Sequence, residues 1–121
     1  MSNAAETAVA RYVALVTERD AEKRRQLLEQ CFAEDARIVT RSGPLVGHAA
    51  IGAMLARFVD DPENLGVRIT SVVDARGTTF RFRAVTDRRD GTMLEVFDAG
   101  EIDAAGRISV LLTFPGPLAD A

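Results

Sequence analysis

The spacing of apolar residues changes once along the chain, near Pro62, and this change restricts the possible folds more than any other feature. Before Pro62, apolar side chains recur every three or four residues, as they do on one face of a helix. Two such stripes comprise Ala5, Val9, Tyr12 and Val16, and then Ile51, Met54, Leu55 and Phe58. Asp20 is a suitable N-cap for a further helix between them. The first half therefore predicts three helices, with a short strand at residues 36–40.

After Pro62 the pattern is that of strands separated by turns. Four runs are rich in β-branched and aromatic residues or alternate apolar with polar ones, namely residues 67–75, 78–86, 92–103 and 107–114. Asp90-Gly91 lies between the second and third runs and predicts a hairpin turn of the primed type. We therefore expect one domain over residues 1–121, of the α+β class, in which three N-terminal helices cover one face of a curved antiparallel sheet.

The strand at residues 92–103 is apolar on both faces. Met93 and Phe97 point one way, while Leu94, Val96 and Ile102 point the other. A sheet with two apolar faces needs a cover on each side, and the helices cover only one of them. We therefore expect a homodimer in which a second copy covers the other face.

Charge and composition exclude several classes of protein. The 15 basic and 18 acidic residues give a formal net charge of −3, whereas nucleic-acid-binding domains usually carry a basic excess. No apolar run approaches the roughly 18 residues that span a bilayer, and the N-terminus lacks the pattern of a signal peptide. The sequence therefore predicts no nucleic-acid or membrane partner and a cytoplasmic location.

The usual cofactor and metal motifs are absent from the sequence, including GxGxxG, the P-loop and HExxH. One cysteine and one histidine are too few for a typical zinc site, so we expect neither a cofactor nor a metal. Cys31 lies on an apolar helix stripe, where it is best interpreted as a core residue. His48, at a predicted helix start, is interpreted as a capping or solvent-facing residue, with an acid–base role in a pocket as the alternative.

Two residues place polar groups among apolar ones. Tyr12 is the only tyrosine and lies on the apolar stripe of the first helix, where its hydroxyl needs a partner if buried. Asp98 shares its strand face with Leu94 and Val96. A carboxyl group in such surroundings is either paired or kept protonated by desolvation. Asp98 is therefore either an inward structural residue or a hydrogen-bonding group in a ligand pocket.

Four segments, RYVAL, FAEDARIV, GHAAI and FDAGEIDAAGRISVLLTFPG, together resemble the nuclear transport factor 2-like superfamily, which includes SnoaL-like cyclases and steroid Δ-isomerases. The resemblance implies a cone-shaped α+β roll, cystatin-like in outline, whose helices cap a curved sheet around an apolar cavity. It also implies a ligand pocket, which we expect to be lined by Val16, Met54, Phe58, Leu94, Val96 and Leu112.

Within that superfamily, the ketosteroid isomerases give the most specific comparison. Tyr12 and Asp98 stand where that family has its oxyanion-hole tyrosine and its protonated aspartate. The position of the family's general base, counted from the Asp35 in FAEDARIV, is Thr40 in this chain. A threonine hydroxyl does not abstract protons near neutral pH, so the donor half of the site is present and the base is missing.

Three hypotheses remain open from the sequence. The first is binding of a steroid-, polyketide- or ketone-like molecule with a carbonyl or hydroxyl, through Tyr12 and Asp98. The second is an isomerase, dehydratase or cyclase that uses another base, either His48 or a water held by Thr40. The third is a non-catalytic structural or interaction module whose cavity is filled by its own side chains.

Overall fold

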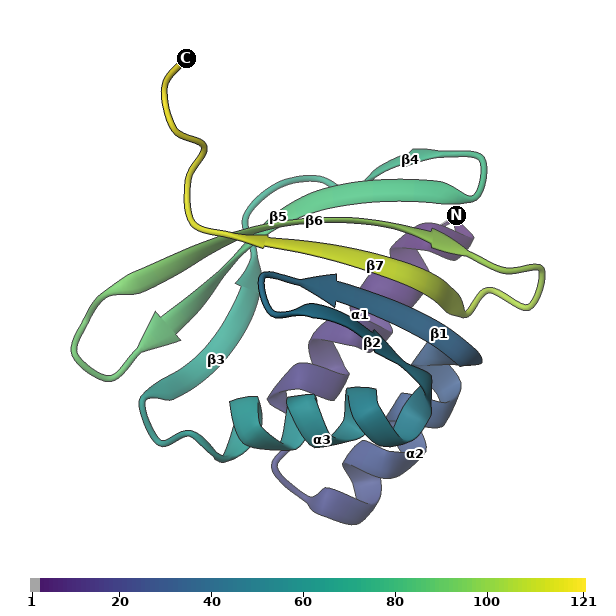
Figure 1. Ribbon diagram of the computed structural model, residues 1–121, viewed down its shortest axis with the longest axis horizontal. Coiled ribbons are helices and arrows are strands. Elements are labelled where there is room, and N and C mark those ends of the chain that lie inside the picture. The colour runs from purple at the N-terminus through teal and green to yellow at the C-terminus, as the bar shows by residue number, and fades with distance from the viewer. Residues whose placement is uncertain (1–2) are drawn as a thin grey trace.

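The computed structural model describes residues 3–121, which form three helices and one seven-stranded sheet (Figure 1). The helices are α1 (Ala4–Thr17), α2 (Ala21–Cys31) and α3 (Gly47–Asp60). The strands are β1 (Phe32–Thr40), β2 (Gly43–Val46), β3 (Asn64–Ile69), β4 (Asp74–Arg76), β5 (Thr79–Arg88), β6 (Met93–Ile102) and β7 (Ile108–Pro115). The α+β class and the three predicted helices are confirmed.

The helices begin where the sequence supplies caps. The Asp20 carboxylate accepts from the backbone N–H of Lys23 at 2.9 Å, which confirms its predicted role at the start of α2. Asn3 caps α1 in the same way by accepting from Glu6 at 2.8 Å. No helix within residues 3–121 is long and apolar enough to cross a membrane.

The sheet is mixed rather than wholly antiparallel. Its strand order is β2-β1-β7-β6-β5-β3, with β4 also paired to β5, and β1 runs parallel to β7. The expected antiparallel pairing is confirmed for β3, β5, β6 and β7, whereas β1 joins the sheet parallel to β7, with Ile38 opposite Leu111. This pairing joins residues more than 70 positions apart in the chain, so no local pattern reveals it.

The strand expected at residues 67–75 is divided into β3 and β4, which pair with different parts of β5. Between them, the Ser71 hydroxyl accepts from the backbone N–H of Arg83 at 2.8 Å, where a continuous strand would present a carbonyl.

The connection from β5 to β6 also differs from the primed turn expected. Gly91 has φ of +87° and donates to the Arg88 carbonyl, while no non-glycine residue within 3–121 has positive φ. A type I′ turn needs a positive φ at both of its central residues, and this hairpin has a positive φ at Gly91 alone. The connection is therefore a type I turn followed by a glycine bulge.

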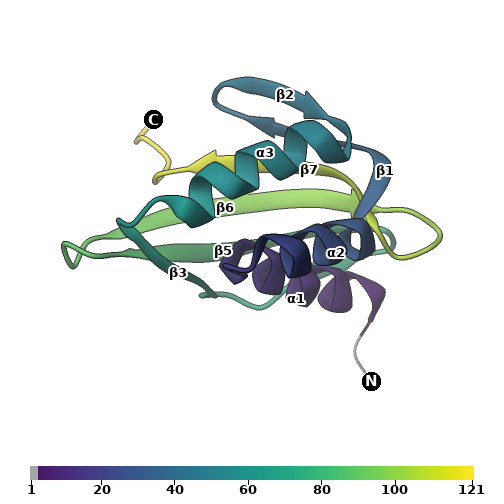
Figure 2. The ribbon, with the colours of Figure 1, turned by 90° about the horizontal axis from the view of Figure 1, so that it is seen from below.

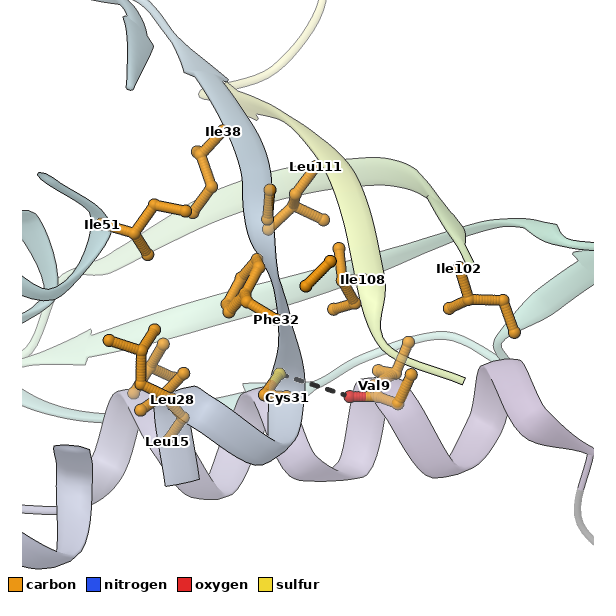
Figure 3. Close-up of a cluster of buried hydrophobic side chains, with 14 of the residues drawn as sticks. Val9, Leu15, Leu28, Cys31, Phe32, Ile38, Ile51, Ile102, Ile108 and Leu111 are labelled. Atoms are coloured by element: carbon orange, nitrogen blue, oxygen red, sulfur yellow. Dashed lines mark hydrogen bonds between the residues drawn. The ribbon is translucent and has the colours of Figure 1, made fainter. Parts of the chain in front are cut away.

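All three helices lie on one side of the sheet (Figure 1), and from that side α3 covers one edge and α1 and α2 the other (Figure 2). Side chains from the helices, β1 and β7 meet around Phe32, which is fully buried (Figure 3). Cys31 is part of this core, with its Sγ 4.0 Å from the Ala8 carbonyl oxygen. Cys31 is 1% exposed, which confirms its interpretation as a core residue, and burial raises the pKa of its thiol to about 12.

The opposite face of the sheet carries exposed apolar side chains. Met93, Phe97 and Phe114 are 59%, 37% and 55% exposed, and Phe97 lies directly opposite Phe114 in the register of β6 and β7. The prediction that the sheet is apolar on both faces is therefore confirmed. The homodimer inferred from it stays a prediction.

Candidate ligand-binding site

A cavity of about 290 Å³ lies between the helices and the inner face of the sheet. Its walls are mainly apolar and come from α1, α3 and five strands of the sheet, β1, β3, β5, β6 and β7. Its polar members are one phenol, three threonine hydroxyls and one carboxyl, from Tyr12, Thr40, Thr86, Thr113 and Asp98. Within residues 3–121, no cluster of three or more His, Cys, Asp or Glu side chains could hold a metal ion.

Tyr12 projects from α1 into this cavity and is held between two rings of the sheet. Its ring meets Phe32 edge-on with centroids 6.1 Å apart, and it is tilted against Phe82 with centroids 6.5 Å apart. Burial raises the pKa of the Tyr12 hydroxyl well above its usual value of 10, and the nearby Asp98 carboxylate raises it further. The hydroxyl therefore stays protonated and is available as a donor.

Asp98 lies in the middle of β6, opposite Phe82 on β5 and Thr113 on β7. Its side chain lines the cavity, yet the residue is only 2% exposed. Burial raises the pKa of its carboxyl to about 7, against a smaller lowering by the Thr113 hydroxyl. One carboxyl oxygen, Oδ1, is buried without a hydrogen-bond partner among the residues that the structure describes.

The structure brings Tyr12 and Asp98 to one cavity, and the resemblance to the ketosteroid isomerases implies the same pairing. The ring of Tyr12 packs against Phe82, and Asp98 lies opposite Phe82 in the register of β5 and β6, so the two side chains are near neighbours. In their protonated forms both are hydrogen-bond donors. Two neutral donors in apolar surroundings can bind a carbonyl or phenol oxygen, or stabilise negative charge that develops on it.

Thr40 also lines the cavity, at the end of β1, so the position of the missing base is part of the site. Its Oγ1 accepts from the backbone N–H of Ser42 at 3.2 Å, where the chain turns into β2. Asp98 is the only carboxyl group among the described residues that line the cavity. No second carboxylate is therefore in place to take a proton from a ligand.

The structure does not bring His48 to this cavity. His48 lies at the start of α3, where its Nε2 is 2.9 Å from the Phe32 carbonyl oxygen. It faces a separate hollow between α2 and α3, together with Arg24 and Leu28. The expectation that His48 serves as the base in a pocket formed with Tyr12 therefore has no support from the geometry.

Of the six residues expected to line the pocket, five do so, namely Val16, Met54, Phe58, Leu94 and Val96. Leu112 is the exception and requires a correction. It lies opposite Ala99 and faces the outer side of the sheet, while the next residue, Thr113, lies opposite Asp98 and faces the cavity. Since β7 is apolar on both faces, alternation alone does not show which face points inward.

Sequence reasoning also missed two polar residues of the cavity, Thr86 and Thr113. Thr86 could have been found from the alternation of β5, because it continues the face formed by Phe82 and Ala84. Thr113 could not, because its face depends on the register between β6 and β7, which shifts near Ile102.

Residues 9–110 match the SnoaL-like domain family, and the chain belongs to that family. A search of curated protein sequences finds no match. Among solved structures, the fold is similar to a SnoaL-like family protein from Agrobacterium tumefaciens that is provisionally described as an isomerase. The two share 25% identity with a TM-score of 0.84, over 94% of this chain and 98% of the other.

Two further structures share the fold at lower identity. An NTF2-like protein of unknown function from Exiguobacterium sp. 255-15 is 20% identical with a TM-score of 0.68, over 92% of this chain and 99% of the other. The epoxide hydrolase/cyclase-like enzyme SalBIII is described as having a role in pyran ring formation in the polyether salinomycin. It is 20% identical with a TM-score of 0.71, over 92% of this chain and 89% of the other. The predicted nuclear transport factor 2-like fold is therefore confirmed.

Proposed function

We propose that this protein binds a small, mostly apolar molecule and hydrogen-bonds its carbonyl or phenol oxygen with Tyr12 and Asp98. The observation that carries the proposal is the carboxyl group of Asp98, which lines an apolar cavity at 2% exposure while its Oδ1 has no partner within residues 3–121. Burying a polar group without a hydrogen bond is costly, and a ligand oxygen in the cavity would offset that cost.

The size and lining of the cavity support a small ligand. At about 290 Å³ it is just below the range of roughly 300–1,000 Å³ that is usual for small-molecule sites. Apolar side chains such as Val16, Met54 and Phe58 form most of its wall. A flat aromatic or alicyclic ligand with one oxygen at its inner end suits such a site better than a charged or extended molecule.

An isomerase-type reaction is the second candidate, and the donor pair favours it. Tyr12 and Asp98 can stabilise an enolate-like oxyanion. The similar protein from A. tumefaciens is provisionally described as an isomerase, which also supports this candidate. Because Thr40 replaces the base, a water held at Thr40 would have to accept the proton. Binding without rapid turnover is therefore the primary proposal.

Titration calorimetry with 4-hydroxybiphenyl tests the binding proposal. Tyr12→Phe and Asp98→Leu should each weaken binding about two- to tenfold, since each removes one hydrogen bond to the phenol oxygen. Asp98→Asn is the matched control, because its amide keeps a donor of the same shape. Unchanged affinity in both donor variants would overturn the proposal.

A further inference from the structure

A second buried polar side chain, Thr86, lines the same cavity away from Asp98. Thr86 lies on β5 opposite Leu94 and is 4% exposed. Within residues 3–121 its hydroxyl forms no hydrogen bond, and unlike Asp98 Oδ1 it is not sealed from the cavity. The site therefore has a polar group that the Tyr12 and Asp98 pair does not use.

The register of β5 and β6 gives the spacing between these polar groups. Phe82 and Thr86 are four residues apart on one strand face, which places them at most about 13 Å apart. Asp98 lies opposite Phe82, and Leu94 lies opposite Thr86. Ala84 and Val96 pair with each other between these two positions and are apolar. The inner face of the sheet is thus polar at two points separated by an apolar interval.

The hydroxyl of Thr86 has no structural task in its own surroundings. Its cross-strand partners are Val67 on β3 and Leu94 on β6, neither of which offers a side-chain acceptor. Valine has the same branched shape and also favours strands, so an apolar wall at this position would not need a hydroxyl. A polar group of a bound molecule is the partner that this position lacks.

We propose that Thr86 is a specificity-determining residue that selects ligands with an oxygen at each end. The ligand class is a rigid molecule of at least two rings, with a carbonyl or phenol oxygen at the Tyr12 and Asp98 end. At its other end it carries a hydroxyl or carbonyl that bonds to Thr86. This inference rests on the proposed function, because it assigns the second contact of the same ligand.

Two phenols that differ only at the far end provide the test. 4-Hydroxybiphenyl carries one hydroxyl, and 4,4′-dihydroxybiphenyl carries a second one at the opposite end of its two rings. The dihydroxy compound has two equivalent ends, which alone doubles its association constant. The unmodified protein should therefore bind it about four- to twentyfold more tightly by titration calorimetry, the statistical factor multiplied by the effect of one additional hydrogen bond. Thr86→Val should reduce this preference to the statistical factor of about two, whereas Thr86→Ser should keep it.

The outcomes separate this inference from the proposed function. If the dihydroxy compound binds no more than about twofold more tightly, and Tyr12→Phe weakens both phenols, the donor pair is correct and the role of Thr86 is overturned. If neither phenol binds, both proposals fail. If Thr86→Val weakens both phenols equally, the residue has a structural role only, and the inference is likewise overturned.

Discussion

Asp98 on β6 lies directly opposite Phe82 on β5, and the ring of Phe82 packs against the ring of Tyr12 with centroids 6.5 Å apart. Directly opposed residues on one face of a sheet are close neighbours. Phe82 therefore sets the position of the Tyr12 phenol relative to the Asp98 carboxyl. The phenol of Tyr12 and the carboxyl of Asp98 are thus placed near each other by an apolar residue that neighbours both.

The raised pKa of Asp98 predicts a pH-dependent stability. The carboxyl has a pKa of about 7 in the folded protein and about 3.8 as its ordinary value. Between these pH values the folded state holds a proton that the unfolded state has released, so stability should fall as pH rises from about 4 to 7. A difference of three pKa units corresponds to about 4 kcal/mol of unfolding free energy.

Urea unfolding of Asp98→Asn should show this directly. The variant should lose most of the decline between pH 4 and 7, and it should be more stable than the unmodified protein at pH 8. Asp120→Asn, at an exposed position near the C-terminus, is the matched control and should leave the decline unchanged. Equal slopes for the unmodified protein and Asp98→Asn would show that Asp98 does not titrate in this range.

A double-mutant cycle tests whether Tyr12 and Asp98 share one acceptor. Two donors to the same ligand oxygen should couple, so the combined loss of 4-hydroxybiphenyl affinity in Tyr12→Phe/Asp98→Leu should differ from the sum of the single losses by about 0.5 kcal/mol or more. The measurement is calorimetry on the four proteins. Strict additivity would mean that the two side chains contact different parts of the ligand.

Replacing Thr40 by aspartate supplies a carboxylate at the position of the missing base. We expect Thr40→Asp to give weak isomerase activity on a β,γ-unsaturated ketone, detected by the ultraviolet absorbance of the conjugated product. Since an error of about 1 Å in the position of a base can cost roughly 10²-fold, the gain will be small. Adding Tyr12→Phe to Thr40→Asp should abolish the activity, and activity that survives would place the reaction elsewhere.

Gly100 should not tolerate a side chain. A Cβ at this position would overlap the carbonyl oxygen of Val110 and come within 2.8 Å of the Phe80 ring. Gly100→Ala should therefore reduce the free energy of unfolding by about 1–3 kcal/mol, as other overpacking substitutions do. Gly66→Ala is the control, because nothing lies within 4 Å of its Cβ, and it should change stability by less than about 0.5 kcal/mol.

The exposed apolar residues on the outer face of the sheet predict a homodimer. Sedimentation velocity at micromolar concentration should show a dimer, with an interface that buries more than about 1,000 Å² in total. Phe97→Arg should shift the protein to monomer, while Val46→Arg, at an exposed site on β2, should not. A monomer at these concentrations would contradict the prediction.

Much of this architecture follows from local patterns in the sequence. The stripe containing Tyr12 and the cap at Asp20 predict α1 and the start of α2, because a helix face and its first N–H groups depend on residues within a few positions. Alternation along β6 likewise places Asp98 with Leu94 and Val96 on the inner face. The resemblance to a known family adds the pairing of Tyr12 with Asp98, which no local pattern contains.

Other features were decided only by the tertiary structure. The parallel pairing of β1 with β7, the inward face of Thr113 and the outward face of Leu112 depend on register between distant strands. The location of His48 outside the cavity depends on how α3 packs against β1, through the contact with Phe32. By itself the sequence determined which side chains share a helix or strand face, because neighbouring covalent geometry sets that period. Which faces meet, and so which polar groups share one cavity, was decided by long-range packing.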